Sequence, residues 1–372
     1  MNLRYSKLLN VEFWVSLVLV LFLICAFVYR TTWFTEHGQR DFVHVLYFCR
    51  IMMLGFLIYY LKRNFSIRFF LVSTLIIFTS YFIYITNHNF FLFDLFIIPL
   101  FITNFLSKKK FYNLFFYTYL SCTVLTFVLH FLGVLPHLEH YRTDSVRYAL
   151  GFLHPNTLGL FCILISMLFF LKTSKLTLIN SIFYLIIAFF CYFVPNSISA
   201  TVVVFILFLL SIICNYIELE IYSAEFKKIL FICICIIVLS IFLVVIFVGT
   251  TGVGEEIIKL LPGELWARFS MGNDALQKYG VSLWGNQEVV HDIIVDSAYY
   301  YLIVVKGCIP AIIYVLLFLT AIKKCIYFND TRLLFIQLLT LIYGFSENTI
   351  CYPYVMFVFV SLSYSLLSNN KS

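Results

Sequence analysis

The sequence predicts an all-α integral membrane protein with about 12 transmembrane helices and one long extracytoplasmic loop late in the chain. Hydrophobic residues make up 63% of the 372, charged residues only 12%, and the mean hydropathy is +0.99. A soluble domain carries roughly 25% charged residues, so this composition excludes an ordinary soluble protein. Apolar runs long enough to cross a hydrocarbon core recur along the chain, and such runs indicate helices, not a barrel.

These runs define one polytopic membrane domain over residues 1–372. The first run follows Arg4 and Lys7 and has no small-residue cleavage site, so we expect a retained anchor instead of a signal peptide. The expected spans are residues 11–29, 43–61, 69–87, 90–106, 112–133, 157–171, 177–195, 198–216, 229–249, 298–322, 333–346 and 350–368.

The placement of Lys and Arg predicts the orientation. Of the 25 such residues, sixteen fall on the side of the two termini, seven fall on the other side, and Arg50 and Lys306 lie within spans. The positive-inside rule therefore makes both termini cytoplasmic. The net charge of +7 follows from this topology, so it gives no reason to expect a nucleic-acid partner.

Two larger segments between the expected spans fall on the outer side, at residues 134–156 and 250–297. In the second, residues 264–278 space their apolar side chains as one helical face would, and we expect that face to lie on the membrane surface. Glu264 and Arg268 are four residues apart on this helix, so a local ion pair is one explanation of Arg268.

Several classes of protein find no support in the sequence. It contains no Gly-rich phosphate loop, no HExxH zinc motif and no internal repeat of the kind that two-halved transporters carry. The eleven cysteines show no metal-type spacing, and we assign them no chemistry.

Polar residues at membrane depth are the candidates for function, because a charge there costs about 2.5–3.5 kcal/mol on insertion scales. Arg50 lies about eight residues deep. It either faces a polar cavity that opens outward or pairs with Asp94. The run from Arg147 to Gly159 is a short polar interruption of the apolar sequence. Its His-Pro-Asn tripeptide either belongs to a site or only forms the turn and cap that open the next helix, with Asn156 as the cap.

The polar run resembles a known family. The pattern Arg147-x₃-Gly151-Phe-x-His154-Pro155-Asn156-x-x-Gly159 is similar to that of the O-antigen polymerase and O-antigen ligase superfamily, above all its capsular and exopolysaccharide polymerases. Ligases of that superfamily carry His, then Asn, Ser or Gln, nine residues and Gly at the end of the late loop. Here Asp296-Ser297 and Gly307 fit that frame. Asp replaces the His, and Pro310 stands where ligases have Gly, Thr or Tyr, which favours a polymerase.

The resemblance implies glycosyl transfer at the outer face of a bacterial cytoplasmic membrane. The substrates would be a glycan on undecaprenyl diphosphate and a single lipid-linked repeat unit, with no metal or cofactor involved. A flippase and a chain-length regulator are the implied partners. The alternatives are a ligase-like glycan transferase and a flippase for lipid-linked oligosaccharide.

Such a transfer requires cations for the leaving diphosphate, and the fork of an Arg guanidinium matches phosphate oxygens. Arg147 and Arg268 are the first candidates, followed by Arg142 and Arg50. Asn156 is expected to shape this binding site.

The attacking hydroxyl requires a base within hydrogen-bond reach. Asp296 is the first candidate, His154 the second, and Glu347 a third carboxylate. Asp296 is also explained as the N-cap of the tenth span. We expect the polar run and the late loop to contribute to one joint site.

Overall fold

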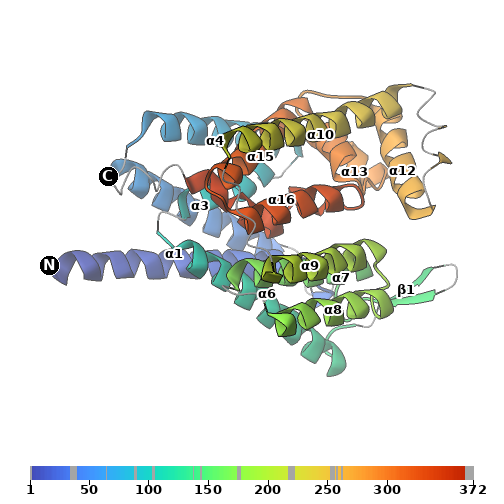
Figure 1. Cartoon of the computed structure of the whole chain (residues 1–372), viewed down its shortest axis with the longest axis horizontal. Helices are drawn as coiled ribbons and strands as arrows, with labels where there is room; N and C mark the ends of the chain where they lie inside the picture. The colour runs from blue at the N-terminus through green and yellow to red at the C-terminus, as the bar shows by residue number, and fades with distance from the viewer. Residues whose placement is uncertain are drawn as a thin grey trace. The chain divides into compact units, whose positions relative to one another are not determined.

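The computed structural model is mostly helical and divides into two compact units (Figure 1). Unit 1 comprises Met1–Asn64 and Phe101–Leu219, and unit 2 comprises Phe65–Leu100 and Glu220–Ser372. The described residues are 2–33, 40–63, 65–87, 90–102, 105–136, 138–142, 145–173, 177–216, 223–251, 256, 259–260 and 263–364.

Unit 1 is a helical bundle with one small β-hairpin. Ser107 begins α6 by accepting the Lys110 amide at 3.3 Å, and Thr177 begins α8 in the same way. The core is aromatic: the Phe161 ring lies 4.4 Å from that of Phe27 and 5.5 Å from that of Tyr119. The elements are α1 (Asn2–Val28), α3 (Arg40–Arg63), α6 (Lys108–Phe131), β1 (Glu139–Arg142), β2 (Ser145–Tyr148), α7 (Pro155–Lys172), α8 (Leu178–Phe193) and α9 (Ile198–Tyr216).

Unit 2 combines long helices with π-helical and 3₁₀ segments. In its core the rings of Phe96 and Phe359 meet edge to face with centroids 4.5 Å apart, and Gln337 donates to the Val358 carbonyl at 2.9 Å. The elements are α4 (Ile67–Asn87), η1 (Phe93–Ile97), α5 (Ile98–Ile102, at the unit boundary), α10 (Ala224–Thr250), α12 (Gly263–Tyr279), α13 (Glu288–Asp292), α14 (Ala298–Tyr300), η2 (Tyr301–Lys306), α15 (Cys308–Tyr327), α16 (Thr331–Gly344), η3 (Asn348–Cys351) and η4 (Pro353–Ser363).

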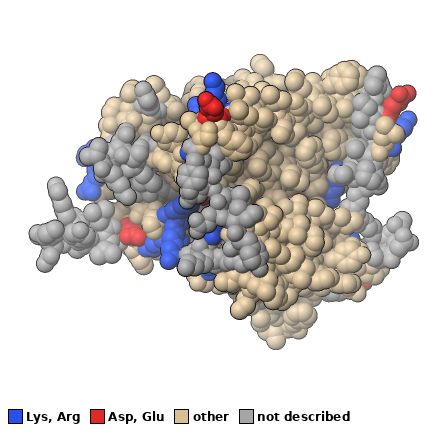
Figure 2. Space-filling model, in the orientation of Figure 1, with Lys and Arg blue, Asp and Glu red and all other residues tan. Residues whose placement is uncertain are grey.

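Seven helices of the described chain are long and apolar enough to cross a membrane, namely α1, α3, α4, α6, α7, α10 and α15. Four shorter apolar helices match further expected spans: α8, α9, α16 and η4. The visible surface is largely uncharged (Figure 2). These features fit the all-α membrane class, whereas the number of twelve spans and their orientation stay predictions.

Two expected spans are not regular α-helices over their whole length. In the span expected at 90–106, the π-helical segment η1 passes directly into α5, which ends at Ile102. The span expected at 298–322 is divided at Gly307, whose φ of +96° ends η2. A Cβ at Gly307 would lie 2.3 Å from the Gly285 amide nitrogen, so the preceding loop passes too close for any side chain.

Both segments that are expected outside contain secondary structure. Residues 139–142 and 145–148 pair as two antiparallel strands, which the sequence analysis did not predict, at the end of α7 and α8 in Figure 1. The helix expected at 264–278 is confirmed as α12. Part of its apolar side packs on protein instead of facing the membrane, since Leu276 is buried and the Phe269 ring lies 5.8 Å from that of Tyr300.

Candidate functional site

In unit 1 the hairpin and the start of α7 bring together four polar side chains, which we name the hairpin cluster: His140, Arg147, His154 and Asn156. The strand register places His140 opposite Arg147. The rings of His140 and His154 meet edge to face, with centroids 4.7 Å apart. The hairpin therefore supplies half of the cluster and the first turn of α7 the other half.

Arg147 is the buried cation of this cluster, with 9% of its surface exposed. Its Nε donates to the Pro195 carbonyl at 2.9 Å, and its Nη2 donates to Oδ1 of Asn156. Pro195 lies just before α9, so one guanidinium connects the hairpin, the start of α7 and the approach to α9. A charge buried this deeply requires such hydrogen bonds.

His154 is the N-cap of α7. Its Nδ1 accepts the Asn156 amide at 3.1 Å, and Pro155 follows at the first helical position, where the missing N–H costs nothing. The prediction that Asn156 is a cap is thus wrong, because its side chain binds Arg147 instead. The cap bond occupies the Nδ1 lone pair of His154, which disfavours His154 as a general base.

The rest of the polar run is explained by packing. Leu150 and Gly151 have φ of +46° and +84°, and a Cβ at Gly151 would lie 3.0 Å from both Leu135 and Thr126. The Gly151 carbonyl also accepts the Thr32 amide at 2.9 Å, which attaches this turn to the end of α1. The positive φ and the close packing at this position therefore explain why residue 151 is glycine.

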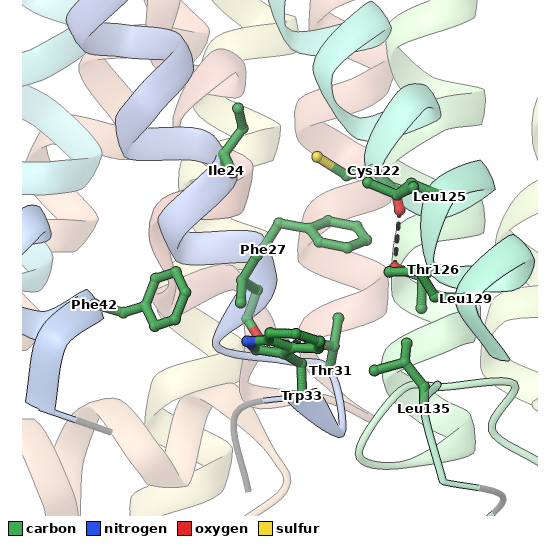
Figure 3. A pocket seen from close by; sticks show the side chains of 11 residues that line it. Ile24, Phe27, Thr31, Trp33, Phe42, Cys122, Leu125, Thr126, Leu129 and Leu135 are labelled. Carbon is green, nitrogen blue, oxygen red and sulfur yellow. Dashed lines mark hydrogen bonds between the residues drawn. The ribbon is translucent and has the colours of Figure 1, made fainter. Parts of the chain in front are cut away.

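Beside this turn lies an apolar pocket of about 310 Å³ within unit 1 (Figure 3). Phe27 and Trp33 line one side, and Thr126, Leu129 and Leu135 the other. The Thr126 hydroxyl donates to the Cys122 carbonyl at 2.8 Å, so this side of the pocket stays apolar. Thr126 and Leu135 are also the residues that pack on Gly151, which makes the pocket a neighbour of the polar run.

In unit 2 a second group contains three predicted site residues, which we name the α12 cluster: Arg268, Asp296 and Glu347. Arg268 projects from α12, and its Nη1 donates to Oε1 of Glu347 at 2.8 Å. The two side chains are only 11% and 8% exposed. The expected local partner Glu264 has a side chain outside the described residues. The observed partner is 79 positions away in sequence.

Asp296 lies in the extended segment before α14. Ser297, not Asp296, is the N-cap residue, so the interpretation of Asp296 as a cap is wrong. Burial raises the pKa of the Asp296 carboxyl, and the Arg268 guanidinium only partly opposes this rise. A raised pKa is typical of a carboxylate that accepts and releases a proton.

Aromatic rings and further polar atoms surround the α12 cluster, and the sequence analysis did not single them out. Phe345 stacks on Phe269 at 6.3 Å and meets Tyr299 edge on at 4.9 Å. In the described part of the chain, three buried polar atoms near these elements have no hydrogen-bond partner: Oδ1 of Asn273, Oγ of Ser297 and Oη of Tyr300. Buried polar atoms normally have partners, such as ordered water, so these three atoms are candidate contacts for water or a ligand.

The remaining predicted residues lie apart from these contacts. Arg142 ends β1 opposite Ser145, and its side chain is outside the described part. Arg50 belongs to α3, with its guanidinium 5.7 Å from the ring centres of Phe22 and Tyr47. Asp94 is buried in η1 of unit 2. No cavity beside Arg50 is established, so its role stays a prediction.

No three His, Cys, Asp or Glu side chains of the described residues gather closely enough to hold a metal ion. Comparison with protein-family models, curated proteins and solved structures finds no match for this chain. The resemblance to the polymerase and ligase superfamily therefore stays a prediction from the sequence. The joint site is likewise a prediction, since the hairpin cluster belongs to unit 1 and the α12 cluster to unit 2.

Proposed function

We propose that this chain is a polysaccharide polymerase, a glycosyltransferase that joins undecaprenyl-diphosphate-linked repeat units on the outer face of a bacterial cytoplasmic membrane. One observation carries the proposal: a half-buried carboxyl with a raised pKa, Asp296, lies near a guanidinium that is only 11% exposed and is held by a second carboxylate. A base and an anion-binding cation are the two groups that this transfer requires.

In the proposed reaction the acceptor hydroxyl oxygen attacks the anomeric carbon of the donor sugar. Asp296 accepts the hydroxyl proton as the new C–O bond forms. The bond from the anomeric carbon to the diphosphate breaks, and the lipid diphosphate leaves with the electron pair. Arg268, oriented by Glu347, stabilises the charge that develops on the leaving diphosphate.

The hairpin cluster has a binding role in this proposal. Arg147 and Asn156 shape a polar surface at the start of α7, and the His154 ring lies beside it, against the sugar or the phosphate. The helix N-terminus itself favours a negative charge there. The neighbouring apolar pocket suits part of an isoprenoid chain. Arg142 and Arg50 are kept as secondary contacts for the diphosphate.

Deletion of the gene tests the function directly. Cells should then carry surface glycan of a single repeat unit and no long chains, as seen on a gel of extracted polysaccharide. Long lipid-linked chains that stay unattached would identify a ligase-like enzyme and overturn the proposal. Repeat units trapped on the cytoplasmic face would identify a flippase and overturn it as well.

The substitution Asp296→Asn tests the site. Since Asp296 is the base, polymer output in the complemented deletion strain should fall by about 10²–10⁴-fold, the usual contribution of acid–base catalysis. The fold should become more stable, because a raised pKa means that ionised Asp296 destabilises the folded state at neutral pH. Thermal unfolding of the purified protein and chain-length gels measure the two effects.

The matched control is Asp292→Asn, four residues earlier on α13. Asp292 pairs with Lys278 at an exposed position, and this contact lowers its pKa. Its substitution should leave polymer output unchanged and should not raise the melting temperature. Full polymer output from Asp296→Asn at normal expression would remove Asp296 from the reaction while leaving the family assignment open.

A further inference from the structure

A second cavity lies in unit 2, between the start of α10 and the end of α15. Its volume is about 680 Å³. Its interior is apolar, with Phe231, Ile232 and Ile326 among the lining residues. Four lysines also line it: Lys227, Lys228, Lys323 and Lys324. No acidic side chain is among the lining residues, so the cavity is a hydrophobic space bordered by positive charge.

Two of the four lysines are engaged by the protein itself. Lys227 donates to the Tyr327 carbonyl at 3.3 Å, and Lys324 donates to the Leu362 carbonyl. Lys323 lies over the Phe231 ring, 5.8 Å from its centre. Lys228 and Lys323 form no ion pair with any carboxylate of the described residues. Their charges are therefore available to an anion.

We propose that this lysine pocket binds an anionic phospholipid, with its phosphate between Lys228 and Lys323 and part of an acyl chain against Phe231 and Ile232. The lysines of the pocket match the anionic head group of such a lipid, and its apolar lining matches the acyl chains. Basic pockets between transmembrane helices are known to bind acidic head groups. The positive-inside rule assigns these helix ends to the cytoplasmic side, where anionic lipids are enriched. The site lies outside both clusters of the proposed reaction.

The test is native mass spectrometry of the full-length chain, delipidated in a neutral detergent and titrated with dioleoyl phosphatidylglycerol or dioleoyl phosphatidylcholine. The wild-type protein should bind phosphatidylglycerol at least about tenfold more tightly than phosphatidylcholine, as each available lysine contributes roughly fivefold. The double variant Lys228→Gln/Lys323→Gln should lose roughly 25-fold in phosphatidylglycerol affinity. Lys228→Arg/Lys323→Arg keeps the charge and should keep the preference.

The matched control is Lys62→Gln/Lys109→Gln, which removes two exposed lysines from helix ends of unit 1. It should leave the preference unchanged. Equal binding of the two lipids, or an equal loss in the control variant, would overturn the proposal. A third arm adds soluble glycerol 3-phosphate at millimolar concentration. If it displaces phosphatidylglycerol completely, the site recognises a free phosphate and the lipid assignment is wrong.

Discussion

Arg268 is the cation of the α12 cluster, and two carboxyl groups lie near it. Glu347 engages one end of its guanidinium, and Asp296 is close enough for its pKa to respond to the charge. An Arg guanidinium has five N–H donors, so one carboxylate oxygen leaves donors for a diphosphate. Glu347 is in this view a positioning residue that fixes the direction of the fork.

For the Arg268–Glu347 ion pair we predict that a double substitution restores stability without restoring activity. Breaking a buried ion pair by removing one partner costs about 3–5 kcal/mol, because the other charge stays buried alone. Arg268→Met and Glu347→Leu should each lower the melting temperature strongly. The double variant Arg268→Met/Glu347→Leu should recover most of the lost stability and still make no long polysaccharide. Fluorescence-detected gel filtration after heating and chain-length gels measure the two properties.

The exposed pair Lys278–Asp292 is the natural comparison, since its side chains are 57% and 43% exposed. Lys278→Gln/Asp292→Asn should change neither quantity measurably. If the double variant at the buried pair regained activity with stability, Arg268 would be a structural residue only.

At the residue scale, the candidate polar residues were easier to predict from the sequence than the side chains that contact them. Arg147, Asp296 and Glu347 stand out because charge is costly among apolar residues. The partner of Arg268 was not predictable, because 79 residues separate it from Glu347 and no local spacing connects them. The cap role of His154 was also hidden, since Asn is the more usual capping residue.

The start of α7 is the element on which the hairpin cluster depends. Gly159 lies one turn into this helix and faces α9: a Cβ there would lie 3.0 Å from the Ala200 Cβ and 3.1 Å from the Ser197 Cβ. Small residues allow two helices this close an approach within a membrane. The same approach places the Pro195 carbonyl within reach of Arg147.

Gly159→Ala should therefore weaken both the packing and the site. Overpacking of this kind costs about 1–3 kcal/mol, and the shift of α9 should withdraw the carbonyl that holds Arg147. Gly55→Ala is the matched control, because no heavy atom of the described residues lies within 4 Å of the position that its new methyl group would take. That variant should be neutral or gain up to about 1 kcal/mol from helix propensity. Equal melting temperatures for the two variants would contradict the close contact.

Long elements were predictable and short ones were not. The runs that became α1, α6 and α10 exceed the length at which an apolar segment has few alternatives to a helix. The hairpin escaped prediction because Thr143-Asp144 is not one of the glycine-containing pairs that mark two-residue turns. The π-helical segments η1 and η2 were not predictable either, because a hydropathy pattern does not distinguish a π-helical turn from an α-helical one.

For the molecule as a whole, the positive-inside rule predicts that basic loops and candidate site residues lie on opposite sides of the membrane. Its basic residues gather in the short loops that the positive-inside rule makes cytoplasmic, whereas both clusters lie on segments that the same rule places outside. Polymer synthesis from lipid-linked units requires the reaction centre on the outer face, and the lysine pocket requires the inner leaflet. The two proposals thus depend on one orientation, and a single experiment on topology tests their common premise.

Reporter fusions measure that orientation. Alkaline phosphatase is active only outside the cytoplasm, whereas green fluorescent protein exported in an unfolded state stays dark. Phosphatase fused after Leu132 or after Thr251 should be active, because the hairpin and α12 follow these positions. Phosphatase fused after Thr173, or after Ser372 at the end of the sequence given, should be inactive, and green fluorescent protein at the same four junctions should give the inverse pattern. Fluorescence from the Thr251 fusion would place Arg268 and Asp296 on the cytoplasmic side, where no lipid-linked polymer is extended by the proposed reaction.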